Sequence, residues 1–593
     1  MVDRTSLIVG WRGLSARDLQ RWLRLTKSGS DLELILVGPQ SAEFRRPADR
    51  NVVSVPADAP GPSGLATAGI LASTGERIVV IGPGAWIDAV SLRLVVAELD
   101  DPMVAIAQPL NERPDTTIHS AGAYFAPGDP VPTPFLAGHA AADAEALSGM
   151  PLPAVSSSVV AMRAADLIAL RGLDPRLDGG FGEVDLSRRA SLAGLGQARL
   201  VPRAIVTVAE DTVDPPQQAG AGRLLAKRWP HPPAGSSECM AVAGFAVKGH
   251  RRDTATGGAV PQLEPLRGRG PSSPALRWTI DTAASAGAWG DAWGDTHFAQ
   301  SLAEALRRLG QHVAVDRRTA RSRASRRLDD VVLVLRGLDR VEPLDGLVNL
   351  LWVISHPDDV TGAEAAGFDA VFAASERWAT QQSQAWGVPI EPLLQCVDVT
   401  RFRPAERPDT RAEASGEDAA APGRVVFVGN ARRDHRRPIV EAALQTDEPI
   451  DLYGTGWKAP GMGDRVVATQ IANDQVGALY ASARVVLNDH WEDMSRHGFV
   501  SNRLFDAVAC GARVLSDPVA GAQELFDGCV RFATTPADVA GLLADPGMSW
   551  PDEAHRRTVA DRIRREHSFD ERARRLLDHV LTRLGDRAER SSP

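Results

Sequence analysis

Closely spaced arginines follow one apolar strand pattern in this sequence. The pattern runs from Val425 to Val428 and ends in a turn at Gly429 and Asn430. Four arginines come directly after that turn: Arg432, Arg433, Arg436 and Arg437. Guanidinium groups beside the exposed amides of a helix N-terminus form a favourable phosphate site. A solvated basic turn is the alternative that the same residues allow.

Two more apolar runs of the C-terminal third end in polar turns. One begins at Asp451 and enters a loop at Gly454, which has the spacing of neither a Walker loop nor a dinucleotide fingerprint. The other, Val485 to Leu487, precedes a turn at Gly498 and the start of a predicted helix. Four polar side chains lie at or just inside that start: Ser501, Asn502, Arg503 and Asp506.

Two further positions carry side chains that can move a proton. An apolar strand from Leu351 to Ile354 ends close to His356, and Asp295 and His297 stand where a helix begins. We expect these three side chains to act as a general base or to orient a substrate. A lone histidine beside a proline is otherwise a capping or packing residue.

The elements that must position these residues alternate between short apolar runs and helical periods, which is typical of α/β domains. Two Rossmann-like halves joined by a short hinge favour a ligand cleft between them. The pattern predicts an N-terminal domain over 1–230, a linker over 231–274, a second domain over 275–405, a hinge over 406–422 and a third domain with closing helices over 423–593.

Composition places the chain among ordinary globular proteins. Its 593 residues are 44% hydrophobic and 24% charged, which excludes disordered and fibrous classes. The net charge of −9 gives no global attraction for nucleic acid. Four cysteines far apart in the sequence indicate a reducing cytoplasm, and no apolar run approaches the roughly 18 residues that span a bilayer.

One basic cluster leaves the question of a membrane contact open. Most such runs are solvated loops, but this one also suits an anionic lipid-linked acceptor or the inner face of a membrane. Peripheral attachment is therefore an alternative to a freely cytoplasmic protein. The cluster consists of Arg317, Arg318, Arg321, Arg323, Arg326 and Arg327.

On the stretches around Gly498 to Asp506 and Ala509-Cys510-Gly511, residues 275–585 resemble GT-B glycosyltransferases of the group 1 or CgeB-like kind, related to family 4. The resemblance implies that the turn after Gly498 presents amides to a donor diphosphate and that Asp506 binds sugar or ribose hydroxyls. Family 4 has two glutamates eight positions apart, and Gly498 or His497 stands where the first would lie. The implied donor-binding set is Gly429, Asn430, Arg432, Arg436, Gly454, Ser501, Asn502, Arg503 and Asp506, with His356, Asp295 and His297 as catalytic candidates.

Residues 5–230 resemble a family 2, GT-A glycosyltransferase, on stretches that include Phe181 to Leu186. Gly82-Pro83-Gly84 stands where that family has its metal-binding aspartates, and glycine offers no carboxylate to a divalent cation. Glu183 lies where the family has its general base, with Asp185 close by; either side chain could instead cap a helix or form an ion pair. This half is expected to be a non-catalytic relic.

The two resemblances imply a hexosyltransferase-type enzyme with an α/β fold, a GT-A-like domain followed by a GT-B pair. It would move a sugar from a nucleotide-diphosphate sugar to a glycan or lipid-linked acceptor, in the synthesis of cell-surface polysaccharide or glycoconjugates. No metal or other cofactor is expected in the GT-B half. The alternatives are a non-catalytic carbohydrate-binding or scaffold protein and a nucleotide-sugar epimerase.

Overall fold

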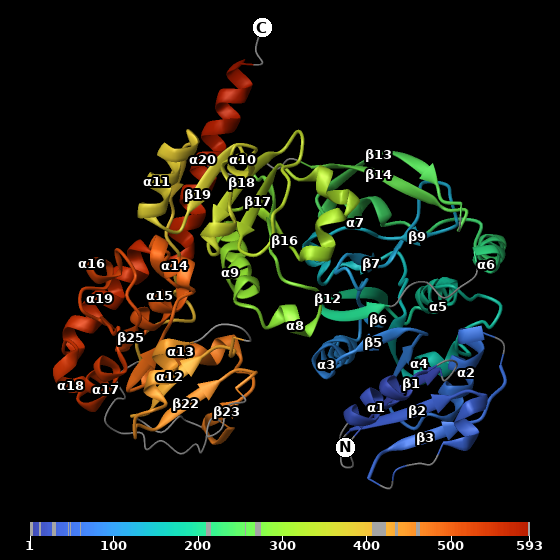
Figure 1. Ribbon diagram of the computed structural model, residues 1–593. Helices are drawn as coiled ribbons and strands as arrows, with labels where there is room; N and C mark the ends of the chain where they lie inside the picture. Colours follow the sequence, from blue (N-terminus) through green and yellow to red (C-terminus); the bar gives the residue numbers. More distant parts are fainter. Residues whose placement is uncertain are drawn as a thin grey trace. The chain divides into compact units, whose positions relative to one another are not determined.

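The structure, a computed structural model, divides the chain into two compact units. Unit 1 comprises the chain up to residue 274 together with 319–328, and unit 2 comprises 275–318 and 329–593 (Figure 1). The predicted hinge over 406–422 lies outside the described residues, as do Arg433 and Arg436. The residues described are 4–10, 14–26, 31–44, 47, 49–59, 61–208, 215–254, 256–266, 274–405, 423–432, 437–457 and 463–590.

A mixed sheet forms the centre of unit 1. Within the described residues its order is β10-β12-β6-β11-β4-β1-β2-β3, with β5 paired to β12 and β7 paired to β6. Strands β3, β2, β1 and β4 are parallel, whereas β11 runs antiparallel to β4. The strands are β1 (Thr5–Gly10), β2 (Leu32–Val37), β3 (Val52–Val55), β4 (Arg77–Ile81), β5 (Ala85–Ile87), β6 (Val104–Glu112), β7 (Ile118–Ser120), β10 (Pro151–Leu152), β11 (Val159–Arg163) and β12 (Gln197–Val208).

Helices cover both faces of this sheet. Successive side chains of a strand point to opposite faces, so Leu34 and Leu36 of β2 join one hydrophobic core while Ile35 and Val37 join another. Helix α2 supplies the second core, and α1 and α3 supply the first. The helices are α1 (Ala16–Leu25), α2 (Gly61–Ala72), α3 (Ala89–Ala97), α4 (Ala164–Ala169), α5 (Phe181–Leu192) and α6 (Pro215–Arg228).

The stretch 231–274, expected to be a linker, is instead folded into unit 1 as far as it is described. It holds α7 (Ser236–Val242) and a hairpin of β13 (Phe245–Arg252) and β14 (Ala259–Pro265); a smaller pair, β8 (Ala123–Tyr124) and β9 (Thr133–Pro134), lies elsewhere in the unit. Cys239, Met240 and Phe245 are buried in the unit's core. These apolar residues are too few and too close to prolines and glycines to show a clear period in the sequence.

Part of the basic cluster is buried rather than solvated. Residues 319–328 belong to unit 1, where Arg323 and Arg326 are only 6% and 4% exposed. The Ser325 hydroxyl donates a hydrogen bond to the Gly138 carbonyl at 2.9 Å, and Leu328 packs on the core of that unit. Arg323 and Arg326 are therefore not available to a lipid surface, whereas Arg318 and Arg327 are exposed.

Unit 2 contains two parallel sheets. Among its described residues, the first has the order β16-β15-β17-β18-β19-β20 and the second has the order β23-β22-β21-β24-β25-β26. The second is the strand order 3-2-1-4-5-6 of the Rossmann fold, and the first begins 2-1-3-4-5 as in flavodoxin-like folds. The strands are β15 (Arg277–Asp281), β16 (His312–Asp316), β17 (Val331–Arg336), β18 (Val348–Val353), β19 (Ala370–Ala373), β20 (Ile390–Pro392), β21 (Val425–Val428), β22 (Ile450–Tyr453), β23 (Val466–Ala468), β24 (Val485–Leu487), β25 (Val514–Ser516) and β26 (Val530–Phe532).

Continuous apolar runs make these strands because both faces of each sheet are covered. In β17, Val331, Leu333 and Leu335 join one core, while Val332 and Val334 join the core on the other face. The helices are α8 (Ala288–Asp291), α9 (Gly294–Arg308), α10 (Gly362–Ala365), α11 (Glu376–Trp386), α12 (Pro438–Ala443), α13 (Asn473–Ser482), α14 (Glu492–His497), α15 (Asn502–Ala509), α16 (Ala522–Phe526), α17 (Pro536–Ala544), α18 (Pro546–Ser549), α19 (Glu553–Glu566) and α20 (Phe569–Arg590).

The last helix returns to the first sheet of unit 2. Figure 1 shows α20 leaving α19 and running beside α9. Its apolar residues recur at helical spacing and enter the core of the first sheet. The chain therefore closes the second α/β half onto the first. The buried residues of α20 are Phe569, Ala573, Leu576, Leu577 and Val580.

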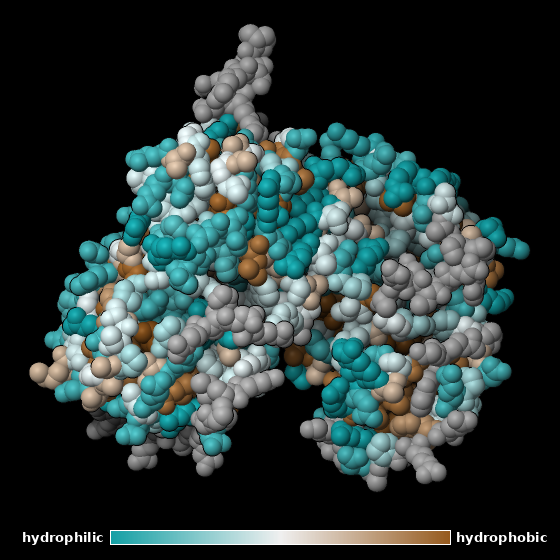
Figure 2. Space-filling model, in the orientation of Figure 1, coloured by the Kyte–Doolittle hydropathy of each residue, from teal (hydrophilic) through white to brown (hydrophobic). Residues whose placement is uncertain are grey.

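Polar side chains cover most of the face shown in Figure 2, and apolar side chains gather there in small separate patches. Single exposed apolar residues, such as Leu71 and Met548, are normal on a folded protein. None of the helices in the described residues is long and apolar enough to cross a membrane.

Candidate functional site

Three arginines meet at the point where the strand order of the second sheet reverses. In an open parallel sheet, ligands bind beyond the carboxyl ends of the strands at this reversal, here β21 and β24. Arg432 and Arg437 follow β21, and Arg503 comes from the first turn of α15. The sheet therefore brings together two of the predicted donor-binding arginines and adds Arg437; the third, Arg436, lies outside the described residues.

One carboxylate lies among these arginines. Asp489, just after β24, has a fully buried side chain. Its Oδ1 atom forms an ion pair with Arg437 and lies 3.5 Å from Nη2 of Arg432. Burial lowers the pKa of Arg437 to about 10 and also lowers that of Arg432, whereas Asp489 raises both. Asp489 is the carboxylate that pairs with two of these guanidinium groups, and Asp517 and Asp493 also act on Arg432 through their charges.

Aromatic rings hold the three guanidinium groups in place. Arg437 and Arg503 lie over the Phe427 ring at 4.8 and 4.9 Å from its centroid, and Arg432 lies over Trp491 at 4.0 Å. These are cation–π distances. Arg503 also donates hydrogen bonds to Oδ1 of Asn488 at 2.7 Å and to the Val428 carbonyl at 2.8 Å.

The predicted glycines and Asn430 shape the turns that follow β21 and β22. A Cβ on Gly429 would lie 3.1 Å from Nη2 of Arg503, and one on Gly454 would lie 2.3 Å from the Gly429 carbonyl oxygen. Oδ1 of Asn430 accepts a hydrogen bond from the Thr455 amide at 2.8 Å. These residues let the turns after β21 and β22 pack closely.

One amide in the turn before α15, which was expected to present its amides to a donor diphosphate, has a partner within the protein. The Ser501 amide donates to Nε2 of His490 at 3.1 Å and is therefore already used. Asn502 donates from Nδ2 to Oδ2 of Asp506 at 2.8 Å. Burial raises the pKa of Asp506 well above its usual range, with the Asp398 carboxylate acting in the same direction. Asn502 and Asp506 thus bind each other in this structure.

The first sheet of unit 2 places Asp295 at its own reversal point, between β15 and β17. A Cβ on Gly337, directly after β17, would lie 3.3 Å from Oδ2 of Asp295. Burial raises the pKa of Asp295, the charge of His356 lowers it and Asp339 raises it. Asp295 and His356 are therefore close enough for their charges to interact.

His356 joins the two halves of the site. It has a left-handed backbone, with φ of 51°, which is uncommon for a residue with a Cβ. Its ring lies 5.4 Å from that of Trp491, and its Nδ1 atom is 3.9 Å from Asp493. Because Trp491 also stacks on Arg432, the predicted catalytic histidine and the arginine cluster share one neighbour.

His297 is not part of this arrangement. It lies two residues beyond Asp295 on α9, and residues two apart on a helix do not face each other. Burial lowers the pKa of His297, and the charges of Arg401 and Arg317 act in the same direction.

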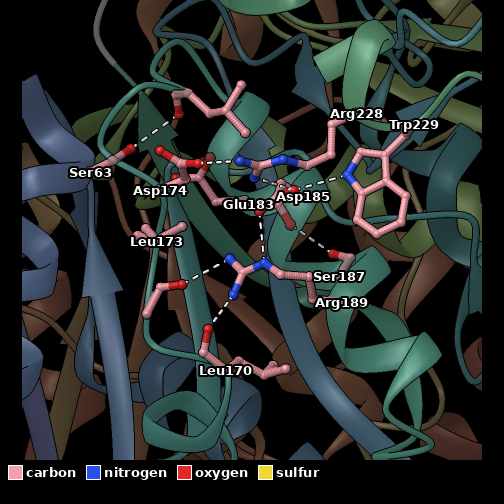
Figure 3. Close-up of polar contacts among 12 residues, drawn as sticks. Ser63, Leu170, Leu173, Asp174, Glu183, Asp185, Ser187, Arg189, Arg228 and Trp229 are labelled. Carbon is pink, nitrogen blue, oxygen red and sulfur yellow. Dashed lines mark hydrogen bonds and ion pairs between the residues drawn. The ribbon is translucent and has the colours of Figure 1, made fainter. Parts of the chain in front are cut away.

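The two predicted site residues of unit 1 have different environments. Asp185 is fully buried and receives hydrogen bonds from Arg189 at 2.8 Å, Arg228 at 2.9 Å and Trp229 at 2.9 Å (Figure 3). The sequence allowed Asp185 to bind a ligand, cap a helix or form an ion pair, and in the structure it forms ion pairs with Arg189 and Arg228. Burial raises the pKa of Glu183 to about 7, and the charge of Asp178 adds to the effect.

Sequence reasoning overlooked Asp489, His490 and Asp517 as site residues, and it named Arg437 in the arginine run without including it in the donor-binding set. All four follow strands whose apolar runs are visible in the sequence. The usable signal was strand order: once β24 is placed beside β21, the residues after both strands must meet.

Comparison with known proteins supports the C-terminal part of this picture. Residues 432–578 match the model of a family described as glycosyl transferase-like, and the match begins at the first arginine of the cluster. The C-terminal region thus contains a glycosyl transferase-like domain. No curated protein matches the chain.

Several solved structures are similar to about half of the chain. Sucrose-phosphate synthase from Thermosynechococcus elongatus is 14% identical, covers 52% of this chain and 100% of its own, and has a TM-score of 0.37. AviGT4, a glycosyltransferase involved in avilamycin A biosynthesis, is 17% identical with coverages of 52% and 98% and a TM-score of 0.36. HepE from Anabaena, in complex with UDP and glucose, is 11% identical with coverages of 52% and 100% and a TM-score of 0.35.

Proposed function

We propose that unit 2 transfers a hexosyl group from a nucleotide-diphosphate sugar to a glycan or lipid-linked acceptor. The observation that carries this proposal is the cluster of Arg432, Arg437 and Arg503 at the ends of β21 and β24, where Asp489 pairs with two of them. Guanidinium groups gathered at a strand-order reversal suit an anionic ligand. It lies within the segment that matches the glycosyl transferase-like family.

The arginines would act on the leaving group. When the bond between the sugar C1 atom and the diphosphate breaks, negative charge develops on the diphosphate oxygen. Guanidinium groups already fixed by Phe427, Trp491 and Asn488 need no reorganisation to stabilise that charge. This supports donor activation by the protein's own cations, without a metal ion.

The first sheet would supply the groups that handle the acceptor. The hydroxyl oxygen of the acceptor forms the new bond to the sugar C1 atom, and the hydroxyl proton must pass to a base. Two candidates for this base are His356, beside Trp491, and Asp295, whose charge interacts with that of His356. His297 faces other groups and is not included.

The remaining parts of the proposal concern unit 1 and the cellular role. We infer a GT-A-like relic in unit 1 because Gly82-Pro83-Gly84 follows β4, where a cation site would need carboxylates. Asp185 is held in ion pairs there. The proposed role is the cytoplasmic synthesis of cell-surface polysaccharide or glycoconjugates.

A donor screen tests the proposal on the whole protein. UDP-, GDP-, dTDP- and CDP-sugars are compared by thermal shift and by hydrolysis, with and without EDTA. A donor binds the folded state and should raise the midpoint of unfolding. Arg503→Met should weaken that donor ten- to a hundredfold, because a charge-assisted hydrogen bond contributes about 1.5–3 kcal/mol.

The matched control is Arg557→Met, which removes a surface arginine paired with Glu553. It should leave donor affinity unchanged. Failure of all donors to bind would favour the carbohydrate-binding scaffold, and conversion of a donor into an isomeric nucleotide sugar would favour an epimerase. Binding that disappears in EDTA would contradict the metal-free mechanism.

A further inference from the structure

His490 occupies a fully buried position between the end of β24 and the start of α15. Its imidazole bridges two elements. Nδ1 lies 2.8 Å from Oδ1 of Asp517, which follows β25, and Nε2 accepts a hydrogen bond from the Ser501 amide at 3.1 Å. The His490 amide also donates to Oδ1 of Asp517, at 2.9 Å.

These contacts determine where the imidazole proton resides. A backbone amide can only donate, so Nε2 must present its lone pair to Ser501. The proton of the neutral ring therefore lies on Nδ1 and points to Asp517. Burial favours the neutral acid at Asp517, but hydrogen bonds from the His490 side chain and amide keep the pKa of this carboxyl below its usual value. An ionised Asp517 holds the ring in this tautomer.

Two arginines of the donor site depend on the same residue. Ser501 is the N-cap of α15, so its bond to His490 sets where the helix begins and where Arg503, in the first turn, projects. The His490 carbonyl accepts a hydrogen bond from Nη1 of Arg432 at 3.1 Å. Loss of the imidazole would loosen the turn that carries Arg503.

We propose that His490 is a positioning residue of the donor site, which fixes the N-terminus of α15 through its neutral Nδ1–H tautomer. The inference rests on the proposed function, since it assigns the positioned arginines to a nucleoside diphosphate. His490 touches no reacting atom; it acts through Ser501 and Arg503.

Two replacements of similar shape test the roles of the two ring nitrogens separately. The amide nitrogen of His490→Asn can replace Nδ1 and keep the bond to Asp517, but leaves the Ser501 amide without an acceptor. The amide oxygen of His490→Gln can reach the position of Nε2 and accept from Ser501. His555→Asn, at a surface histidine, is the control.

The probes are UDP, GDP, dTDP and CDP, titrated calorimetrically against each full-length protein. We expect His490→Asn to weaken the best-binding nucleotide about tenfold, His490→Gln to restore affinity to within about threefold of wild type, and His555→Asn to have no effect. A purely structural role would lower the unfolding midpoint of both variants equally and would show no rescue of affinity by glutamine. Equal nucleotide affinity of wild type and His490→Asn would overturn the positioning role but leave the proposed function standing.

A measurement on the wild-type protein covers the case in which His490→Asn does not fold. Nitrogen chemical shifts of ¹⁵N-labelled histidine distinguish the two tautomers, and His490→Gln identifies the signal. We expect a proton on Nδ1; a proton on Nε2 would overturn the inference. If the wild type binds none of the four nucleotides, both the proposed function and the positioning role are overturned.

Discussion

Because the backbone of His356 is left-handed, a glycine at this position can remove the imidazole with little change in the free energy of unfolding. A left-handed conformation costs a residue with a Cβ about 1 kcal/mol, whereas glycine adopts it freely. Glycine also loses more conformational entropy on folding, by a similar amount. The two terms nearly cancel at this position.

His356→Gly should therefore fold with a free energy of unfolding within about 0.5 kcal/mol of wild type. If the imidazole takes the acceptor proton, turnover should fall about 10²- to 10⁴-fold. Urea denaturation and product formation measure the two quantities. Asp527→Gly, at another left-handed residue, is the control and should keep full turnover. Wild-type turnover in His356→Gly would exclude the histidine as the base.

Glu183 gives the protein a stability that depends on pH. Its pKa rises from 4.5 to about 7 on folding because the site favours the neutral acid. The folded state then holds a proton that the unfolded chain releases between these values. The free energy of unfolding should be greatest below pH 4.5 for this group and should fall as pH rises to about 7, by about 2 to 3 kcal/mol.

Glu183→Gln should remove this dependence. The variant should gain stability over wild type at pH 8 and differ little at pH 4.5, since glutamine resembles the neutral acid. Thermal unfolding across that pH range measures the effect, with the exposed Glu76→Gln as control. A pH profile in Glu183→Gln identical to that of wild type would show that the carboxyl ionises normally.

At the scale of elements, α20 is attached to the first sheet by its apolar stripe and by one buried arginine. Arg572 is 5% exposed and donates to the Leu394 carbonyl at 2.8 Å. It also lies 2.7 Å from Nδ1 of His567, whose pKa burial lowers to about 4, with the charge of Arg572 adding to that effect. A neutral His567 can accept this hydrogen bond.

Arg572→Met should lower the free energy of unfolding of unit 2 by about 3 kcal/mol, because it leaves buried acceptors without a donor. Arg574→Met removes a more exposed arginine of the same helix and should change it by less than about 0.5 kcal/mol. Chemical denaturation of both variants checks the difference. Equal effects would mean that the apolar stripe alone attaches α20.

Elements with strong apolar runs could be predicted from the sequence. Both parallel sheets and the closing helices follow from such runs, because burial on two faces demands them. The hairpin of β13 and β14 could not, since its pattern is interrupted by glycine and charged residues. Arg437 and Asp489 lie 52 positions apart, and only the strand order brings them together.

At the scale of the whole molecule, two compact units predict two unfolding transitions. Glu183→Gln should move one transition and Arg572→Met the other. Leu328→Asp should lower the transition that Glu183→Gln moves, by about 1 to 3 kcal/mol, because Leu328 packs on the core of unit 1. Leu338→Asp, at a half-exposed leucine, is the control. Calorimetry resolves the transitions, and an effect of Leu328→Asp on the other transition would contradict the division.

Residues 319–328 make unit 1 discontinuous in sequence. A single cut cannot excise either unit intact: a fragment ending at 274 lacks ten residues of its own fold, and a fragment starting at 275 carries those ten as a foreign insertion. Freed from unit 1, that insertion would expose Leu328 and the otherwise buried Arg323 and Arg326. Truncations at the apparent domain boundary should aggregate more readily than the intact chain, and domain exchange with other proteins would require three junctions for either unit.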